Sequence, residues 1–171
     1  MSVKHPIISV TGSSGAGTSS VKSTFEQIFR REQVRSMAIE GDAFHRYDRV
    51  KMKEVMAREA QNDNLHFSHF GPQANLLDEL EAEFKRYGET GYCRTRTYVH
   101  DQAEAESTGV PAGTFTDWIE PDDETDVLFY EGLHGAVVTD DVNVAQYPDL
   151  KIGVVPVINL EWTQKIRRDR D

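Results

Sequence analysis

The chain has 171 residues, of which 38% are hydrophobic and 28% charged, as is usual for a globular domain. Its 19 basic and 29 acidic residues give a net charge of -10, the opposite of the charge expected of a nucleic-acid-binding protein. No apolar run approaches the roughly 20 residues of a membrane span, and the single cysteine, Cys93, excludes an internal disulfide and a cysteine-rich zinc site. We therefore expect one domain over residues 1–171 and, because the N-terminus does not resemble a signal peptide, a cytoplasmic location.

Short apolar runs alternate with longer helical patterns along the chain. The runs rich in β-forming residues are PIISV at 6–10, RSMAIEG at 35–41, VLFYEG at 127–132 and KIGVVPVI at 151–158. Helical patterns begin near Thr18 and Arg49. This alternation predicts an α/β fold with a mainly parallel sheet covered by helices.

The middle of the chain contains three further patterns. Residues 75–90 have apolar side chains at helical spacing, so an amphipathic helix that ends near Gly88 is predicted. Residues 107–118 are predicted to form a loop or a hairpin. The acidic run 120–126 is predicted to be a solvated turn, because the spacing of a calcium-binding loop is absent.

A glycine-rich segment follows the first predicted strand and precedes the first predicted helix. Four residues separate Gly12 from Gly17, and Ser19 follows closely, which is the spacing of a phosphate-binding loop. Thr18 occupies the position of the usual lysine. The Ser19 hydroxyl is a candidate Mg²⁺ ligand, although a turn required only for tight packing would have a similar pattern. The candidate nucleotide-binding residues are Gly12, Ser13, Ser14, Gly15, Ala16, Gly17, Thr18 and Ser19.

Two further predicted strands end in carboxylates. Asp42 follows the run at 35–41, and Glu131 lies at the end of the run at 127–132. In open α/β sheets ligands bind beyond the carboxyl ends of the strands, so both side chains are expected to face the glycine-rich loop. A carboxylate there can accept the proton of an attacking hydroxyl, as proposed for Asp42, or hold Mg²⁺, as proposed for Glu131. Each carboxylate taken alone could equally serve a turn or a helix cap.

The segment RTRTYVH at 94–100 alternates like a strand, so one face is predicted to carry Arg94, Arg96, Tyr98 and His100. Arginine suits a phosphate group and histidine or tyrosine suits hydroxyl groups, so this set is typical of a phosphorylated acceptor. His45 and Arg49, which follow Asp42 in the sequence, have the same chemistry. Any one of the histidines could instead have a surface or structural role.

The last residues, NLEWTQKIRRDRD, place Lys165, Arg168 and Asp169 on one face of a predicted helix. An exposed basic helix end would have the same pattern. Phosphoryl transfer requires positive charge near the transferred group, whichever segment supplies it. Lys165 or a neighbouring arginine is therefore a candidate for the charge missing at Thr18.

The chain resembles the bacterial phosphoribulokinases, Calvin-cycle enzymes of carbon dioxide fixation that make ribulose 1,5-bisphosphate. The similar segments are HPIISVTGSSGAGTSS, IEGDAFHR, CRTRTYVHD, LFYEGLHGAVV and DLKIGVVPVINLEW. The resemblance implies a three-layer P-loop fold of the nucleoside-kinase type, ATP and Mg²⁺ as cofactors, and D-ribulose 5-phosphate as substrate. It makes Asp42 the catalytic base, with Lys165, Arg168 and Asp169 as further catalytic residues. It also implies a metal site at Ser19 and Glu131, and substrate binding by His45, Arg49, Tyr98 and His100.

Two features of the family bear on what this chain can do. Bacterial members also have threonine at the position of Thr18, and thioredoxin control is not expected because Ala16 replaces a regulatory cysteine of the chloroplast branch. The family continues for more than a hundred residues, a region that in bacterial members contributes to subunit contacts and to the response to NADH and AMP. By resemblance, a full-length relative would form a homo-oligomer. A uridine-kinase-like enzyme and a catalytically silent nucleotide-binding module remain alternatives.

Overall fold

The computed structural model describes residues 4–157, 162, 163 and 166. Four strands form one sheet in the order β2-β3-β1-β4, and every neighbouring pair is parallel. The strands are β1 (Ile7–Gly12), β2 (Ser36–Glu40), β3 (Val127–Gly132) and β4 (Leu150–Val154). The predicted α/β fold with a parallel sheet is therefore confirmed.

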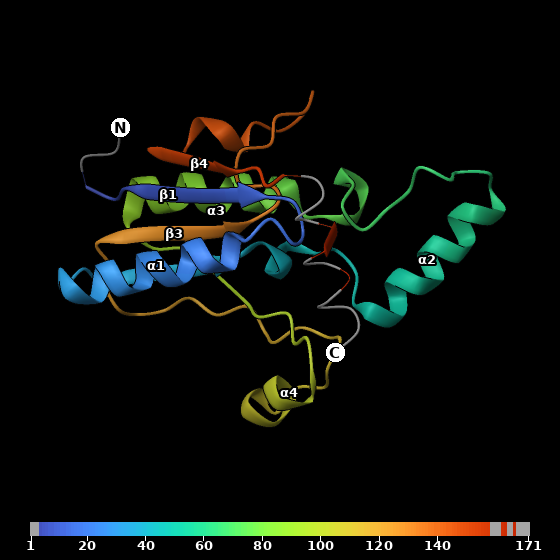
Figure 1. The fold of residues 1–171 in the computed structure, drawn as a ribbon, viewed down its shortest axis with the longest axis horizontal. Coiled ribbons are helices and arrows are strands. Elements are labelled where there is room, and N and C mark those ends of the chain that lie inside the picture. Colours follow the sequence, from blue (N-terminus) through green and yellow to red (C-terminus); the bar gives the residue numbers. More distant parts are fainter. Residues whose placement is uncertain (1–3, 158–161, 164–165, 167–171) are drawn as a thin grey trace.

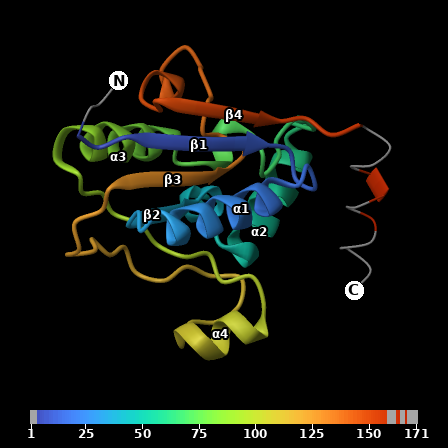
Figure 2. The ribbon, with the colours of Figure 1, turned by 60° about the vertical axis from the view of Figure 1, so that its left-hand side comes forward.

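The helices lie around this sheet as Figure 1 shows. They are α1 (Thr18–Arg31), α2 (Arg49–Gln61), α3 (Leu77–Thr90) and α4 (Gln102–Thr108). Helix α2 projects beyond the carboxyl ends of the strands, and α4 stands apart from the sheet in both views (Figures 1 and 2). Of the helices in the described part of the chain, none is long and apolar enough to cross a bilayer.

Alternation along β3 explains the layered packing. Leu128 and Tyr130 are buried against the α3 side, where the rings of Phe84 and Tyr130 meet edge to face at 5.4 Å between centroids. Phe129 points to the other face and contacts Phe29 of α1 at 5.9 Å between ring centroids. Because successive side chains of a strand point to opposite faces, one strand contributes to two hydrophobic clusters. The result is a three-layer arrangement of α1, sheet and α3.

Helix α3 ends later than the sequence suggests. Gly88 lies inside the helix, and the chain reverses only at Gly91, whose φ is 79° and whose N–H donates to the carbonyl of Tyr87 at 2.8 Å. A glycine costs a helix interior about 1 kcal/mol, which packing of the apolar face offsets. The left-handed conformation after the last turn is the feature that requires glycine.

The predicted strand at 94–100 is wrong. This segment forms only isolated antiparallel bridges, Thr95 with Ile119 and Tyr98 with Phe115. The short helix α4 that follows was not predicted, although its caps are visible in the sequence. Asp101 accepts a hydrogen bond from the Glu104 N–H at the start of α4, and Gly109, with a φ of 72°, ends it.

Candidate active site

The loop between β1 and α1 lines a cavity of about 880 Å³ at the carboxyl ends of the strands. Gly15 and Gly17 have φ values of 90° and 95°, which residues with side chains rarely adopt. Helix α1 starts directly after Gly17, so its free N–H groups and positive dipole end face the loop. All predicted residues of this loop line the cavity except Ala16, which is buried.

The ends of β2 and β3 approach each other closely. A Cβ on Gly132 would lie 2.7 Å from the Cα of Gly41, so only glycine fits at this crossing. Asp42 follows Gly41 in a short 3₁₀ turn, and Glu131 precedes Gly132 at the end of β3. Both carboxylates line the same cavity as the loop, as predicted for this edge of the sheet.

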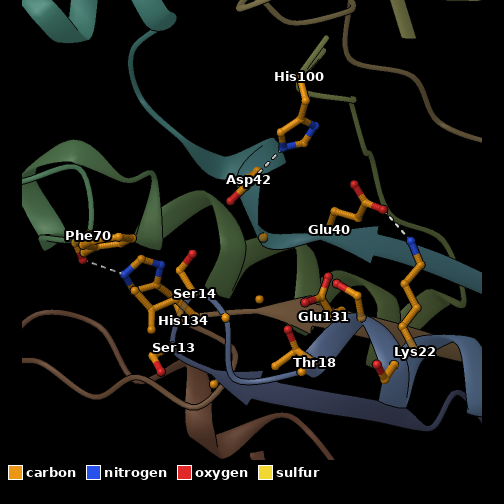
Figure 3. A pocket seen from close by; sticks show the side chains of 18 of the residues that line it. Ser13, Ser14, Thr18, Lys22, Glu40, Asp42, Phe70, His100, Glu131 and His134 are labelled. Atoms are coloured by element: carbon orange, nitrogen blue, oxygen red, sulfur yellow. Dashed lines mark hydrogen bonds and ion pairs between the residues drawn. The ribbon is translucent and has the colours of Figure 1, made fainter. Parts of the chain in front are cut away.

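Two histidines contact the Asp42 carboxylate. His100 Nε2 lies 3.0 Å from Oδ2, and His45 Nε2 lies 3.2 Å from Oδ1. Figure 3 shows the His100 ring directed at Asp42 from above the cavity. Hydrogen bonds from His100 and His45 hold the pKa of Asp42 well below its usual range. The carboxylate is therefore ionised and fixed in orientation.

Each histidine is oriented by a second partner, which is Glu104 for His100 and Asn75 for His45. His45 Nδ1 lies 2.8 Å from Asn75 Oδ1, and Asn75 is itself fixed by donating to the carbonyls of His69 and Gly71. Burial is the largest influence on His45 and disfavours its charged form, but the hydrogen bond and charge of Asp42, together with the hydrogen bond to Asn75, outweigh it, so the pKa of His45 is raised. The hydrogen bond to Asp42 raises the pKa of His100 to about 9, although burial opposes the shift. Both rings therefore donate to Asp42 at neutral pH.

Glu131 is half-buried at the edge of the cavity. No described residue forms a hydrogen bond or an ion pair with its carboxylate, and Figure 3 shows Glu131 and Thr18 among the side chains that line the cavity. The hydroxyl of Ser19 lines the same cavity. Within the described ranges no three His, Cys, Asp or Glu residues form a metal cage. An incomplete set of hard oxygen donors fits Mg²⁺, which binds one or two protein ligands and fills the rest with water and phosphate oxygens.

A smaller cavity of about 210 Å³ adjoins the first. His45 and His69 line both cavities, and Arg49 and Tyr98 line the smaller one. The ring of Tyr98 meets those of His45 and His100 edge to face at 5.9 and 5.0 Å between centroids. The predicted set of His45, Arg49, Tyr98 and His100 is therefore brought together by two separate segments, the one between β2 and the start of α2 and the one at 94–100, rather than by one face of a strand.

Arg94 and Arg96 do not belong to this set, which corrects the prediction that they face the acceptor. Arg94 Nε donates to Glu83 Oε1 at 2.7 Å, and Arg94 Nη2 donates to Glu79 Oε2 at 3.1 Å. Arg96 donates to the carbonyls of Ala43 and His45, both at 2.7 Å. Buried carboxylates and carbonyls need such partners, so both guanidinium groups are used inside the fold.

Several cavity residues have no clear signal in the sequence. Lys22 forms an ion pair with Glu40, and both line the larger cavity, as Figure 3 shows. Lys22 lies one helical turn after Thr18, a spacing that could have identified it. His134 Nε2 donates to the carbonyl of Phe70 at 2.9 Å, and burial lowers the pKa of His134. Its only sequence signal is its place in the loop that follows β3.

The predicted catalytic residues Lys165, Arg168 and Asp169 lie outside the described residues. Their roles stay predictions that rest on the resemblance.

Comparison with known proteins identifies the family. The model of the "Phosphoribulokinase / Uridine kinase family" matches residues 7–171. A phosphoribulokinase of Nitrobacter vulgaris is 69% identical over 168 residues, which cover 98% of this chain and 58% of that protein. Phosphoribulokinase 1 of Cereibacter sphaeroides is 65% identical over 170 residues, 99% of this chain and 59% of the relative.

A solved structure gives the same result for the fold. The structure titled phosphoribulokinase from Rhodobacter spheroides is 60% identical and superposes with a TM-score of 0.86, over 98% of this chain and 57% of that one. The chain thus spans less than two thirds of the length of each of these three phosphoribulokinases. Over this length, the chain belongs to the phosphoribulokinase and uridine kinase family.

Proposed function

We propose that this chain carries the site for ATP-dependent phosphorylation of D-ribulose 5-phosphate to ribulose 1,5-bisphosphate. The observation that carries the proposal is the position of Asp42, which lies in the same cavity as the phosphate-binding loop and is oriented by His45 and His100. A carboxylate so placed can accept a hydroxyl proton next to a bound nucleotide. The identity of 69% to a protein named phosphoribulokinase supports this choice of substrate.

The nucleotide phosphates would be held by backbone N–H groups of residues 12–19 at the start of α1. Ser19 and Glu131 would hold Mg²⁺, which supplies charge neutralisation at the phosphate oxygens when it is bound. Lys165, Arg168 and Asp169 complete the proposed catalytic set by resemblance to the family. Lys165 and Arg168 would add the positive charge that Thr18 cannot supply.

The acceptor would bind in the smaller cavity. Arg49 is directed there and also donates to the carbonyl of His100 at 2.7 Å, which links the acceptor side to the Asp42 cluster. His45 and Tyr98 offer groups for sugar hydroxyls and Arg49 one for the phosphate. The attacking oxygen would form its bond to the γ-phosphorus, the bond to ADP would break, and Asp42 would take the hydroxyl proton.

The test is ADP release by the purified chain with Mg²⁺-ATP and one of D-ribulose 5-phosphate, uridine or no acceptor. We expect turnover that requires D-ribulose 5-phosphate. Substituting Asp42→Asn keeps the size of the side chain but removes the proton acceptor, so the rate should fall by at least about 100-fold. Circular dichroism of both proteins checks that the variant folds.

Asp48→Asn is the matched control, because Asp48 caps α2 and, among the described residues, its carboxylate accepts only from the Lys51 N–H. Its rate should equal that of the unmodified chain. Turnover with uridine in place of D-ribulose 5-phosphate would contradict the proposed substrate. ATP binding without turnover for any acceptor would favour a silent nucleotide-binding module.

A further inference from the structure

Lys22 is surrounded by carboxylates at the edge of the larger cavity. Its amine forms an ion pair with Glu40 and lies within electrostatic range of Glu26 and Glu131. All four side chains line this cavity. The Lys22 side chain is 23% exposed, so its charge is only partly screened by solvent.

The sheet register makes Glu40 and Glu131 direct neighbours. Their Cα atoms are partners in the parallel pairing of β2 with β3. Alternation places both side chains on the face covered by α1, because Phe129 points to α1 and Glu131 is two residues further along the strand. Two carboxylates on adjacent strands, both next to the phosphate-binding loop, could therefore reach one cation.

Only one of these two carboxylates is free among the described residues. Lys22 holds the Glu40 carboxylate, whereas Glu131 forms no hydrogen bond or ion pair there. A second carboxylate ligand would displace water or a phosphate oxygen from Mg²⁺ and tighten its binding to the protein alone. Mg²⁺ at this site would need open positions for the phosphate oxygens of the nucleotide, and a second carboxylate would occupy one of these positions.

We propose that Lys22 is a positioning residue that holds Glu40 away from the metal. Glu131 is then the one carboxylate of this pair that binds the metal. This inference rests on the proposed function, since it assigns Lys22 to the same Mg²⁺-nucleotide site. Lys22 thus does not replace the lysine absent at Thr18. Its amine is directed to a carboxylate of β2 rather than to the loop.

The test measures Mn²⁺ binding to the chain without nucleotide or acceptor, by electron paramagnetic resonance of the free ion. Water proton relaxation then reports the number of waters on the bound ion. Lys22→Met should bind Mn²⁺ roughly tenfold more tightly and with fewer waters, because Glu40 becomes a ligand. Lys22→Arg should behave like the unmodified chain, because it keeps the ion pair.

Two double variants separate ligation by Glu40 from a general change of charge. Both restore the original net charge, and they differ only in which carboxylate is removed. Lys22→Met with Glu40→Gln should return the Mn²⁺ affinity and the water count to their original values. Lys22→Met with Glu26→Gln should keep both values altered, because Glu40 is still free. Circular dichroism of each variant checks the fold.

Unchanged Mn²⁺ binding in Lys22→Met, or absence of Mn²⁺ binding in every protein, would overturn the inference. Equal restoration by both double variants would also overturn it, because the effect would then be one of net charge. Failure of the proposed function has a different signature, namely no turnover with D-ribulose 5-phosphate in the unmodified chain. The Mn²⁺ measurements contain no substrate and report on Lys22 in either case.

Discussion

At the residue scale, the Asp42 cluster combines two requirements that oppose each other. His45 and His100 orient the carboxylate, but by donating hydrogen bonds they also make it a weak proton acceptor. In phosphoryl transfer the transition state is loose, so orientation of the hydroxyl contributes more than early proton removal. A fixed carboxylate of low basicity is compatible with that chemistry.

The charge on His100 can be measured directly. Its pKa is raised to about 9 by Asp42, so NMR titration of its ring should give a midpoint well above the ordinary 6.5, and Asp42→Asn should return it towards that value. The His100–Asp42 pair should therefore contribute its full stability between about pH 4 and pH 6.5, and lose that contribution as the pH rises through about 9 or falls far enough to protonate Asp42.

Urea unfolding at a series of pH values tests the linkage. The free energy of unfolding of the unmodified chain should exceed that of His100→Gln by more at pH 6 than at pH 9.5. The difference should be small, because the His100 and Asp42 side chains are 43% and 51% exposed and solvent screens the pair. A constant difference across this range would contradict a charged His100.

At the element scale, the crossing of the β2 and β3 ends depends on Gly132. Gly132→Ala should lower the free energy of unfolding by roughly 1–3 kcal/mol, because the added Cβ meets the backbone of Gly41. Gly88→Ala in α3 is the control, since its Cβ meets nothing within 4 Å and should stabilise the helix by up to about 1 kcal/mol. Urea unfolding measures both changes, and equal stability of the two variants would show that the close approach is not needed.

Arg94 joins α3 to the segment that carries Tyr98 and His100. Its partner Glu83 is only 3% exposed, so Arg94→Ala should cost up to about 3 kcal/mol of stability, because among the described cations the buried carboxylate then keeps only the more distant Arg86, at 3.8 Å. Glu79→Gln should cost less than about 1 kcal/mol, because Glu79 is 45% exposed.

Steady-state kinetics distinguishes this structural role of Arg94 from acceptor binding. Below the unfolding temperature of the variant, KM for D-ribulose 5-phosphate should be unchanged. A large rise in KM together with little loss of stability would contradict this structural role and show that Arg94 binds the acceptor.

The sequence predicts those elements whose signals are local. Glycine spacing and strand-end position are properties of short segments, and they were sufficient to find the loop at 12–19 and the cavity carboxylates Asp42 and Glu131. The partners of Arg94 and of Lys22 are set by packing between distant elements. No local pattern distinguishes an arginine that binds phosphate from one that neutralises a buried glutamate, so that part of the site had to come from the structure.

At the scale of the whole molecule, strand β4 is less buried than the other three strands of the sheet. The core lies between α1 and α3 around β1, β2 and β3. Among the strands in the described part of the chain, β4 lies at one edge of the sheet, and it is half-buried or exposed along its length. Beyond it, Val155 and Val157 are 90% and 73% exposed. An unpaired edge flanked by exposed apolar side chains favours pairing with another chain.

We therefore expect this chain to self-associate through the β4 edge. Sedimentation velocity should show larger species as the protein concentration rises, and Val155→Lys should reduce them, since a charge at an edge opposes strand pairing. Val50→Lys is the matched control, because Val50 is 68% exposed on α2, away from β4. A net charge of -10 opposes association by repulsion, so added salt should increase it. Equal effects of the two lysine substitutions would place the contact elsewhere, and a monomer at every concentration would refute the expectation.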